Sequence, residues 1–96
     1  MHRLRRIVLL CWCALVLGSV PAYADGQRDL QDGIRFYDNL DLERALELFD
    51  RASNAPDLST GERALALIYA GLSHFELTQT AKAEASWQAA FRLAPD

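Results

Sequence analysis

Residues 45–52 read ALELFDRA, and residues 83–90 read AEASWQAA. Each segment begins and ends with alanine and places an aromatic residue at its fifth position. A glycine precedes each segment by the same interval, at Gly33 and Gly71. All of these matched positions are separated by the interval from Gly33 to Gly71, so the chain contains one pattern written twice. A repeat of this length predicts two similar units that stack against each other.

Apolar residues recur at helical spacing in four parts of the chain, and no part shows a convincing strand pattern. Only a short turn joins the two helices of each pair, so these neighbours should be antiparallel. A longer polar stretch over residues 54–59 separates the pairs. The predicted fold class is all-α, with two stacked antiparallel helical hairpins. The four helices are expected over residues 27–38, 42–53, 60–77 and 81–94.

Polar residues mark the expected starts of three of these helices. Asp41 and Thr80 are residue types that favour the N-cap position. Ser59 and Glu62 have the spacing of a capping box, in which each side chain bonds the other residue's backbone N–H. Pro95 follows the last helix and is expected to end it.

Close packing of helices explains why the repeat uses small and aromatic residues. Helices that pack closely lie about 8–10 Å apart, which requires small residues where they cross. The glycines and alanines are expected at these crossings, and Phe49 and Trp87 are expected to fill the space where the helices diverge. Truncation of either aromatic residue to alanine is expected to cost about 3–5 kcal/mol.

This combination of positions resembles the tetratricopeptide repeat (TPR), a 34-residue helix–turn–helix unit. The resemblance covers residues 26–96, with one repeat over about 26–59 and the second over about 62–96. The chain departs from the family in its longer period, from Gly33 to Gly71, and in carrying His74 and Thr80 where aromatic residues are usual. The residues that carry the resemblance are Gly33, Ala45, Phe49 and Ala52, then Gly71, Ala83, Trp87 and Ala90, with Pro95 at the end.

The resemblance implies binding of a protein partner. In the family, the first helix of each hairpin lines a concave groove, and an uncapped last helix leaves an apolar end. The chain lacks the Lys, Asn and Arg residues that some members use to hold a C-terminal carboxylate. Its apolar residues can equally be core between helices, and that alternative stays open. The candidate partner-binding residues are Leu30, Ile34, Tyr37, Ile68, Leu72, Phe75 and Phe91.

The first 24 residues have the pattern of a secretory signal peptide. Three arginines precede an apolar run over residues 7–20, and Ala22-Tyr23-Ala24 forms an A-x-A cleavage site. The alternative is an uncleaved membrane anchor, but a spanning helix needs about 20 apolar residues. We expect cleavage after Ala24, a domain over residues 25–96 and a periplasmic or secreted location.

Composition restricts the partners of the expected mature chain. Cleavage removes both cysteines and three arginines but no acid, leaving 13 acids, seven bases and a net charge of −6. This balance argues against nucleic acid, whose binding requires clustered Lys and Arg. It argues equally against an anionic membrane surface after cleavage. A protein partner, a second copy of the chain, or both are expected.

The sequence offers little for catalysis or metal binding. His74 is the one histidine after residue 24, too few ligands for a zinc site. The acidic stretch 38–43 lacks the glycine and the alternation of a calcium loop. We therefore expect no cofactor, no metal and no enzyme activity.

Three functions are compatible with these features. The favoured one is an exported, non-catalytic interaction module that uses its concave face or uncapped end. The second is a remnant of a longer repeat array without a function of its own. The third, a small hydrolase using His74 and Thr78, is remote, because that pair more often makes a helix-end hydrogen bond.

Overall fold

The computed structural model describes residues 25–95, and within them every regular element is a helix. The all-α prediction is confirmed, and each helix boundary lies close to its predicted place. The predicted signal peptide, residues 1–24, and Asp96 lie outside the described residues. The helices are α2 (Asp25–Asp38), α3 (Leu42–Ser53), α4 (Thr60–Glu76) and α5 (Thr80–Leu93).

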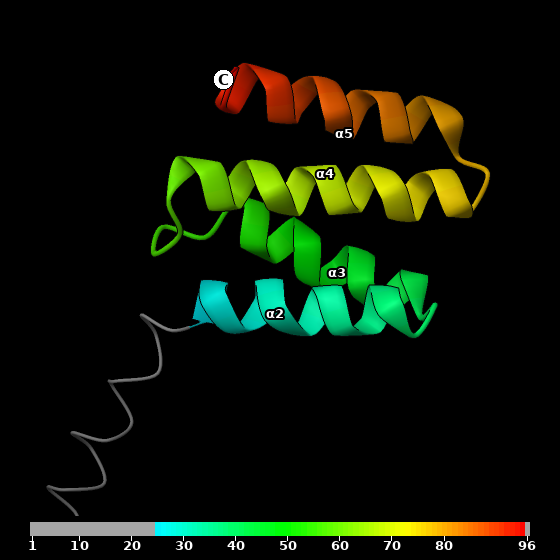
Figure 1. Cartoon of the computed structure of the whole chain (residues 1–96), viewed down its shortest axis with the longest axis horizontal. Coiled ribbons are helices and arrows are strands. Elements are labelled where there is room, and N and C mark those ends of the chain that lie inside the picture. Colours follow the sequence, from blue (N-terminus) through cyan, green and yellow to red (C-terminus); the bar gives the residue numbers. More distant parts are fainter. Residues whose placement is uncertain (1–24, 96) are drawn as a thin grey trace, which may run out of the picture.

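The four helices lie in chain order and form two hairpins (Figure 1). Helices α2 and α3 pack against each other, and so do α4 and α5. Helix α4 also packs along α3 and, over a smaller area, against α2. The predicted stack of two antiparallel hairpins is therefore the arrangement of the described chain, with α5 at one end of the row.

Both hairpin turns use the same backbone geometry. Leu40 and Thr78 have positive φ angles of 62° and 60°. The next residue in each turn, Asp41 or Gln79, donates its N–H to the carbonyl five residues earlier, at 2.9 and 2.8 Å. This pattern is the Schellman motif, which normally has glycine at the left-handed position. Since leucine and threonine are unusual there, the sequence did not reveal the motif.

Replacing Thr78 with glycine is expected to stabilise the fold by about 1 kcal/mol, because a β-branched residue is strained at positive φ. Urea unfolding followed by circular dichroism at 222 nm measures the change. Thr78→Ala is the control, since alanine keeps a Cβ in the same backbone conformation and should recover less stability. An equal gain from both variants would contradict the strain argument.

The capping box at the start of α4 is confirmed. Glu62 N–H donates to Ser59 Oγ at 3.1 Å, and Ser59 N–H donates to Glu62 Oε1 at 3.0 Å. Gln27 Nε2 donates to Glu62 Oε2 at 2.6 Å and so links α2 to α4. The Ser59 backbone and side-chain bonds, followed by the Gln27 bond, lower the pKa of Glu62 below its ordinary value of 4.5. The stabilisation of the fold by these bonds to the Glu62 carboxylate is therefore fully present above the ordinary pKa of 4.5. It is lost as the pH falls through the lower pKa of Glu62 in the folded protein.

Of the other two predicted N-caps, Asp41 holds its predicted position and Thr80 does not. Thr80 is the first residue of α5, and Gln79 occupies the N-cap position. Asp41 is the N-cap residue of α3, but its side chain makes no cap hydrogen bond and lies 3.6 Å from Arg44 Nε. The Schellman turns explain why neither Asp41 nor Gln79 makes a side-chain cap hydrogen bond. These turns hold the two residues at ψ 73° and 66°, away from the extended ψ of 163° at which Ser59 caps α4.

The predicted small residues lie at the close approach of the helices in both hairpins, but the aromatic rings lie there too, against the glycines, rather than where the helices diverge. A Cβ added to Gly33 would lie 2.7 Å from Phe49 Cε1, and one added to Gly71 would overlap the Trp87 indole. The alanines of the repeat are buried beside these contacts. Each glycine therefore lets its helix lie directly on an aromatic ring of the next helix.

The two aromatic residues differ in burial. Phe49 is fully buried, and its ring stacks on Tyr69 of α4 with centroids 5.4 Å apart. Trp87 is only half-buried, and its Nε1–H donates to the carbonyl of Ile68 at 3.2 Å. The expectation of equal costs on truncation is therefore revised: α4 covers Phe49, whereas no described helix covers Trp87 in the same way. The main core comprises Leu30, Ala45, Phe49, Ala52, Ala55, Leu58, Ala66 and Ala70.

Candidate functional site

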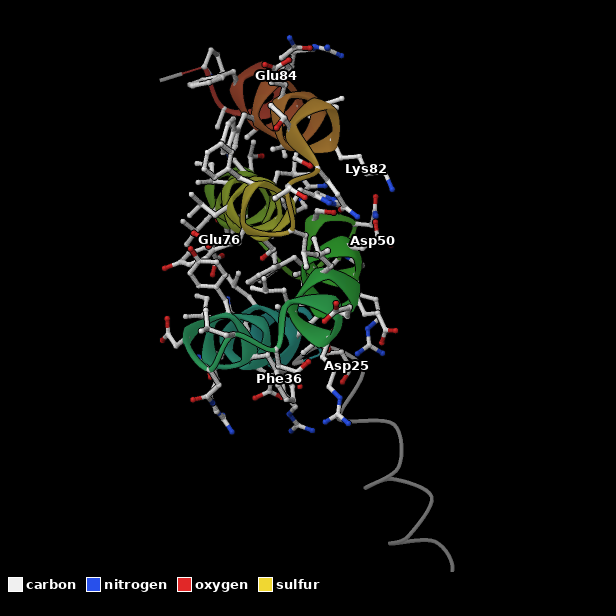
Figure 2. All side chains as sticks on the ribbon, turned by 90° about the vertical axis from the view of Figure 1, so that its right-hand side faces the viewer. Asp25, Phe36, Asp50, Glu76, Lys82 and Glu84 are labelled. Carbon is white, nitrogen blue, oxygen red and sulfur yellow. The ribbon has the colours of Figure 1, made fainter. Side chains whose placement is uncertain are left out.

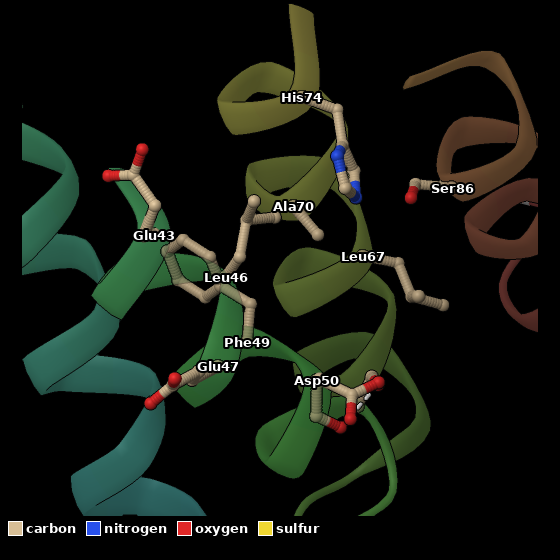
Figure 3. Close-up of a pocket in the computed structure, with 10 residues that line it drawn as sticks. Glu43, Leu46, Glu47, Phe49, Asp50, Leu67, Ala70, His74 and Ser86 are labelled. Atoms are coloured by element: carbon tan, nitrogen blue, oxygen red, sulfur yellow. Dashed lines mark hydrogen bonds between the residues drawn. The ribbon is translucent and has the colours of Figure 1, made fainter. Parts of the chain in front are cut away.

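One hollow of the described chain lies over α4 between α3 and α5 (Figure 3). Its volume is about 380 Å³. Figure 3 shows three acidic side chains, Glu43, Glu47 and Asp50, on α3 and His74 and Ser86 on the opposite side. We call this hollow the acidic groove. Its lining is Glu43, Leu46, Glu47, Phe49, Asp50, Ser53, Leu67, Ala70, His74 and Ser86.

The acidic groove brings together residues that sequence reasoning did not connect. Ser86 and the α3 acids are far apart in the chain and line the same hollow only because the hairpins stack. His74 Nδ1 lies 2.7 Å from Gln79 Oε1, and Thr78 Oγ1 donates to the carbonyl of Leu77 at 2.6 Å. His74 and Thr78 therefore bond to other partners rather than to each other. Within residues 25–95, no group of three or more His, Cys, Asp or Glu side chains is placed to hold a metal ion.

Another hollow lies between α4 and α5 and has a volume of about 340 Å³. Small residues of both helices form its floor, and Leu65, Ile68 and Phe91 stand around it. Leu72 and Phe75 continue the row of Leu65 and Ile68 along α4. We call these residues together the open face. They are Gly61, Ala64, Leu65, Ile68, Leu72, Phe75, Ala90, Phe91, Ala94 and Pro95.

The open face exposes large apolar side chains. Leu65, Ile68, Phe75 and Phe91 are 39, 41, 54 and 69% exposed. The Phe75 and Trp87 rings are 6.2 Å apart, so the aromatic surface extends from α4 to α5. None of the open-face residues is charged. Figure 2 shows Asp50 and Lys82 on one side of the helix row and Glu76, which follows Phe75 in the chain, on the other.

The candidate residues of the first hairpin belong to the packing between hairpins. Leu30 is 5% exposed and is part of the core, so it does not line a surface and its prediction as a partner-binding residue is corrected. Ile34 and Tyr37 are half-buried and pack against the same core. The Tyr37 ring meets the edge of Tyr69 of α4 at 5.5 Å. Helix α4 therefore occupies the surface that these residues were expected to offer.

The candidate residues of the second hairpin lie on the open face. Ile68, Leu72 and Phe75 are the equivalents, one repeat later, of Leu30, Ile34 and Tyr37. Ile68 and Phe75 are exposed, and Leu72 is half-buried. Ile68 and Phe91 line the same hollow, so the structure brings two of the candidates together.

Comparisons with known proteins do not assign this chain to a family. No family model, curated protein or solved structure matches it. None of the helices between residues 25 and 95 combines the length and the apolar character needed to cross a membrane.

Proposed function

We propose that this chain is an exported, non-catalytic protein–protein interaction module of the TPR type, which binds an apolar helix of a protein on its open face. The observation that carries the proposal is the exposed row of apolar side chains around a floor of small residues. Exposed apolar patches of this kind often mark interaction sites in soluble proteins. The signal-peptide pattern of residues 1–24 supports a location outside the cytoplasm.

The internal repeat supplies the chemistry of the bound helix. On the first hairpin, the surface equivalent to the open face is covered by α4. Helix α4 contributes Ala66, Tyr69 and Ala70 to this contact, with Tyr69 stacked on Phe49. A helix with two small residues beside one aromatic residue is therefore suited to the second hairpin as well, where Trp87 stands in place of Phe49.

A peptide with the sequence of residues 60–77 tests the proposal. It carries Leu65→Glu, Ile68→Lys, Leu72→Glu and Phe75→Lys, so that the open-face row is charged while the α4 face that meets the first hairpin is unchanged. The peptide is labelled with a fluorophore and titrated with the purified protein while its anisotropy is measured. We expect saturable binding that weakens at least tenfold in the Phe91→Glu protein, because an anionic group would then stand in the apolar hollow.

Two controls make the peptide titration specific. Leu40→Glu changes a residue that is 72% exposed but lies in the α2–α3 turn, so this protein should bind the peptide normally. A peptide that also carries Ala66→Lys and Ala70→Lys has lost its small residues and should not bind. Equal binding to the wild-type and Phe91→Glu proteins would refute the proposed site.

A further inference from the structure

The outer surface of α2 does not suit the open face of another copy. Arg28, Gln31 and Asp32 of α2 are the equivalents in the repeat of Ala66, Tyr69 and Ala70, the residues that α4 packs on the first hairpin. They lie at the surface, where Asp32 pairs with Arg35 at 2.9 Å. Stacking α2 on the open face of the next copy would bury these charges beside apolar groups, which is unfavourable. Head-to-tail assembly of copies is therefore disfavoured.

The acidic groove is equally unsuited to contact with itself. Glu43, Glu47 and Asp50 line it, and two copies meeting there would bring like charges together. The open face has the opposite property. The whole chain carries 13 acids and ten bases, yet none of these residues belongs to the open face. Two copies can meet at the open face without placing like charges at the centre of the contact.

The large apolar side chains of the open face supply part of the area that a dimer requires. If the value of about 200 Å² for an aromatic side chain is applied to all four of its largest members, their exposed fractions amount to at most about 400 Å² per copy. Two copies would bury at most about 800 Å² from these side chains alone, against about 1,200–2,000 Å² in stable interfaces. Leu72, Trp87 and the small floor residues contribute further area.

We propose that two copies of this chain bind each other through their open faces, related by a two-fold axis, with Phe91 of each copy packed into the hollow of the other. This inference rests on the proposed function, because it names the partner of the same face. The hollow of about 340 Å³ has room for a phenyl ring. A large aromatic residue that fills a pocket is the usual anchor of an interface. The contact uses the same surface twice, so it closes as a dimer.

Sedimentation velocity of the purified protein tests the dimer. The full chain is expressed with residues 1–24 in place, so that the host performs any processing, and the soluble product is purified. We expect the mass of a dimer for the wild type and for Leu40→Glu, and that of a monomer for Phe91→Glu and for Ile68→Lys. Far-UV circular dichroism should show equal helix content in all four proteins. A wild-type monomer up to its solubility limit, or growth beyond a dimer, would overturn the two-fold contact.

The labelled peptide separates failure of the dimer from failure of the proposed function. If the copies and the peptide share the open face, saturating peptide should convert the dimer into a one-to-one complex. A monomeric wild type that still binds the peptide overturns the dimer and leaves the proposed function standing. A monomeric wild type that ignores the peptide refutes both.

Discussion

Replacement of Phe49 by alanine should remove about 3–5 kcal/mol of stability, the typical cost of deleting a buried aromatic side chain. Phe49 is the largest fully buried side chain in the described chain, and it contacts Gly33 on one hairpin and Tyr69 on the other. Its loss leaves a cavity at the junction of α2, α3 and α4. A domain of this size has a total stability of only about 3–5 kcal/mol. We therefore expect the variant to be largely unfolded, as measured by circular dichroism at 222 nm and urea titration.

Phe91→Ala is the matched control for Phe49→Ala. The same atoms are removed, but Phe91 is 69% exposed and leaves no enclosed cavity. In dilute solution, where association contributes little, the change should lie within about 0.5 kcal/mol. Similar losses in the two variants would show that the junction around Phe49 is not the main source of stability.

Gly33→Ala is expected to destabilise the protein by about 1–3 kcal/mol, the cost of adding a methyl group to a packed core. The new Cβ would lie 2.7 Å from Cε1 and 2.9 Å from Cδ1 of Phe49. The Gly33 backbone is part of α2, and the Phe49 ring is enclosed by α2 and α4, so neither can move away from the new methyl group. This steric cost acts against the gain of about 1 kcal/mol that alanine usually brings over glycine inside a helix. Thermal and urea unfolding measure the net loss.

Gly61→Ala should have the opposite sign. Gly61 also lies in a helix, but nothing stands within 4 Å of a Cβ added there. The substitution should stabilise the protein by about 0.5–1 kcal/mol, because alanine loses less backbone entropy than glycine on entering a helix. A loss of stability at Gly33 together with a gain at Gly61 would show that the Phe49 ring lies directly against the backbone at Gly33. Effects of the same sign would contradict it.

The repeat pattern was informative because its residue types follow directly from close helix packing. Gly33 is predicted where two helices approach closely, and it lies at such a contact, although the structure places the Phe49 ring there as well. The buried alanines follow from the same constraint, and so do the helix boundaries. The capping box at Ser59 was predictable because its two members are close neighbours in the chain.

The turns and the candidate site were less predictable. Leu40 and Thr78 are not typical of left-handed backbone, so their geometry follows from the hydrogen bonds that close each hairpin rather than from residue preference. The sequence pattern could not distinguish Leu30 from Ile68, since both are apolar residues at equivalent positions of the repeat. Their different exposure depends on which hairpin lies over them.

The sequence by itself determined the local structure: four helices, two hairpins and the small residues at their crossings. Helical periodicity, short turns and close packing leave signatures within one hairpin, so they can be read from residue types and spacing. Only the tertiary structure decided which apolar surface is core and which is free. That difference arises because α4 packs on the first hairpin, and no described helix packs in the same way on the second.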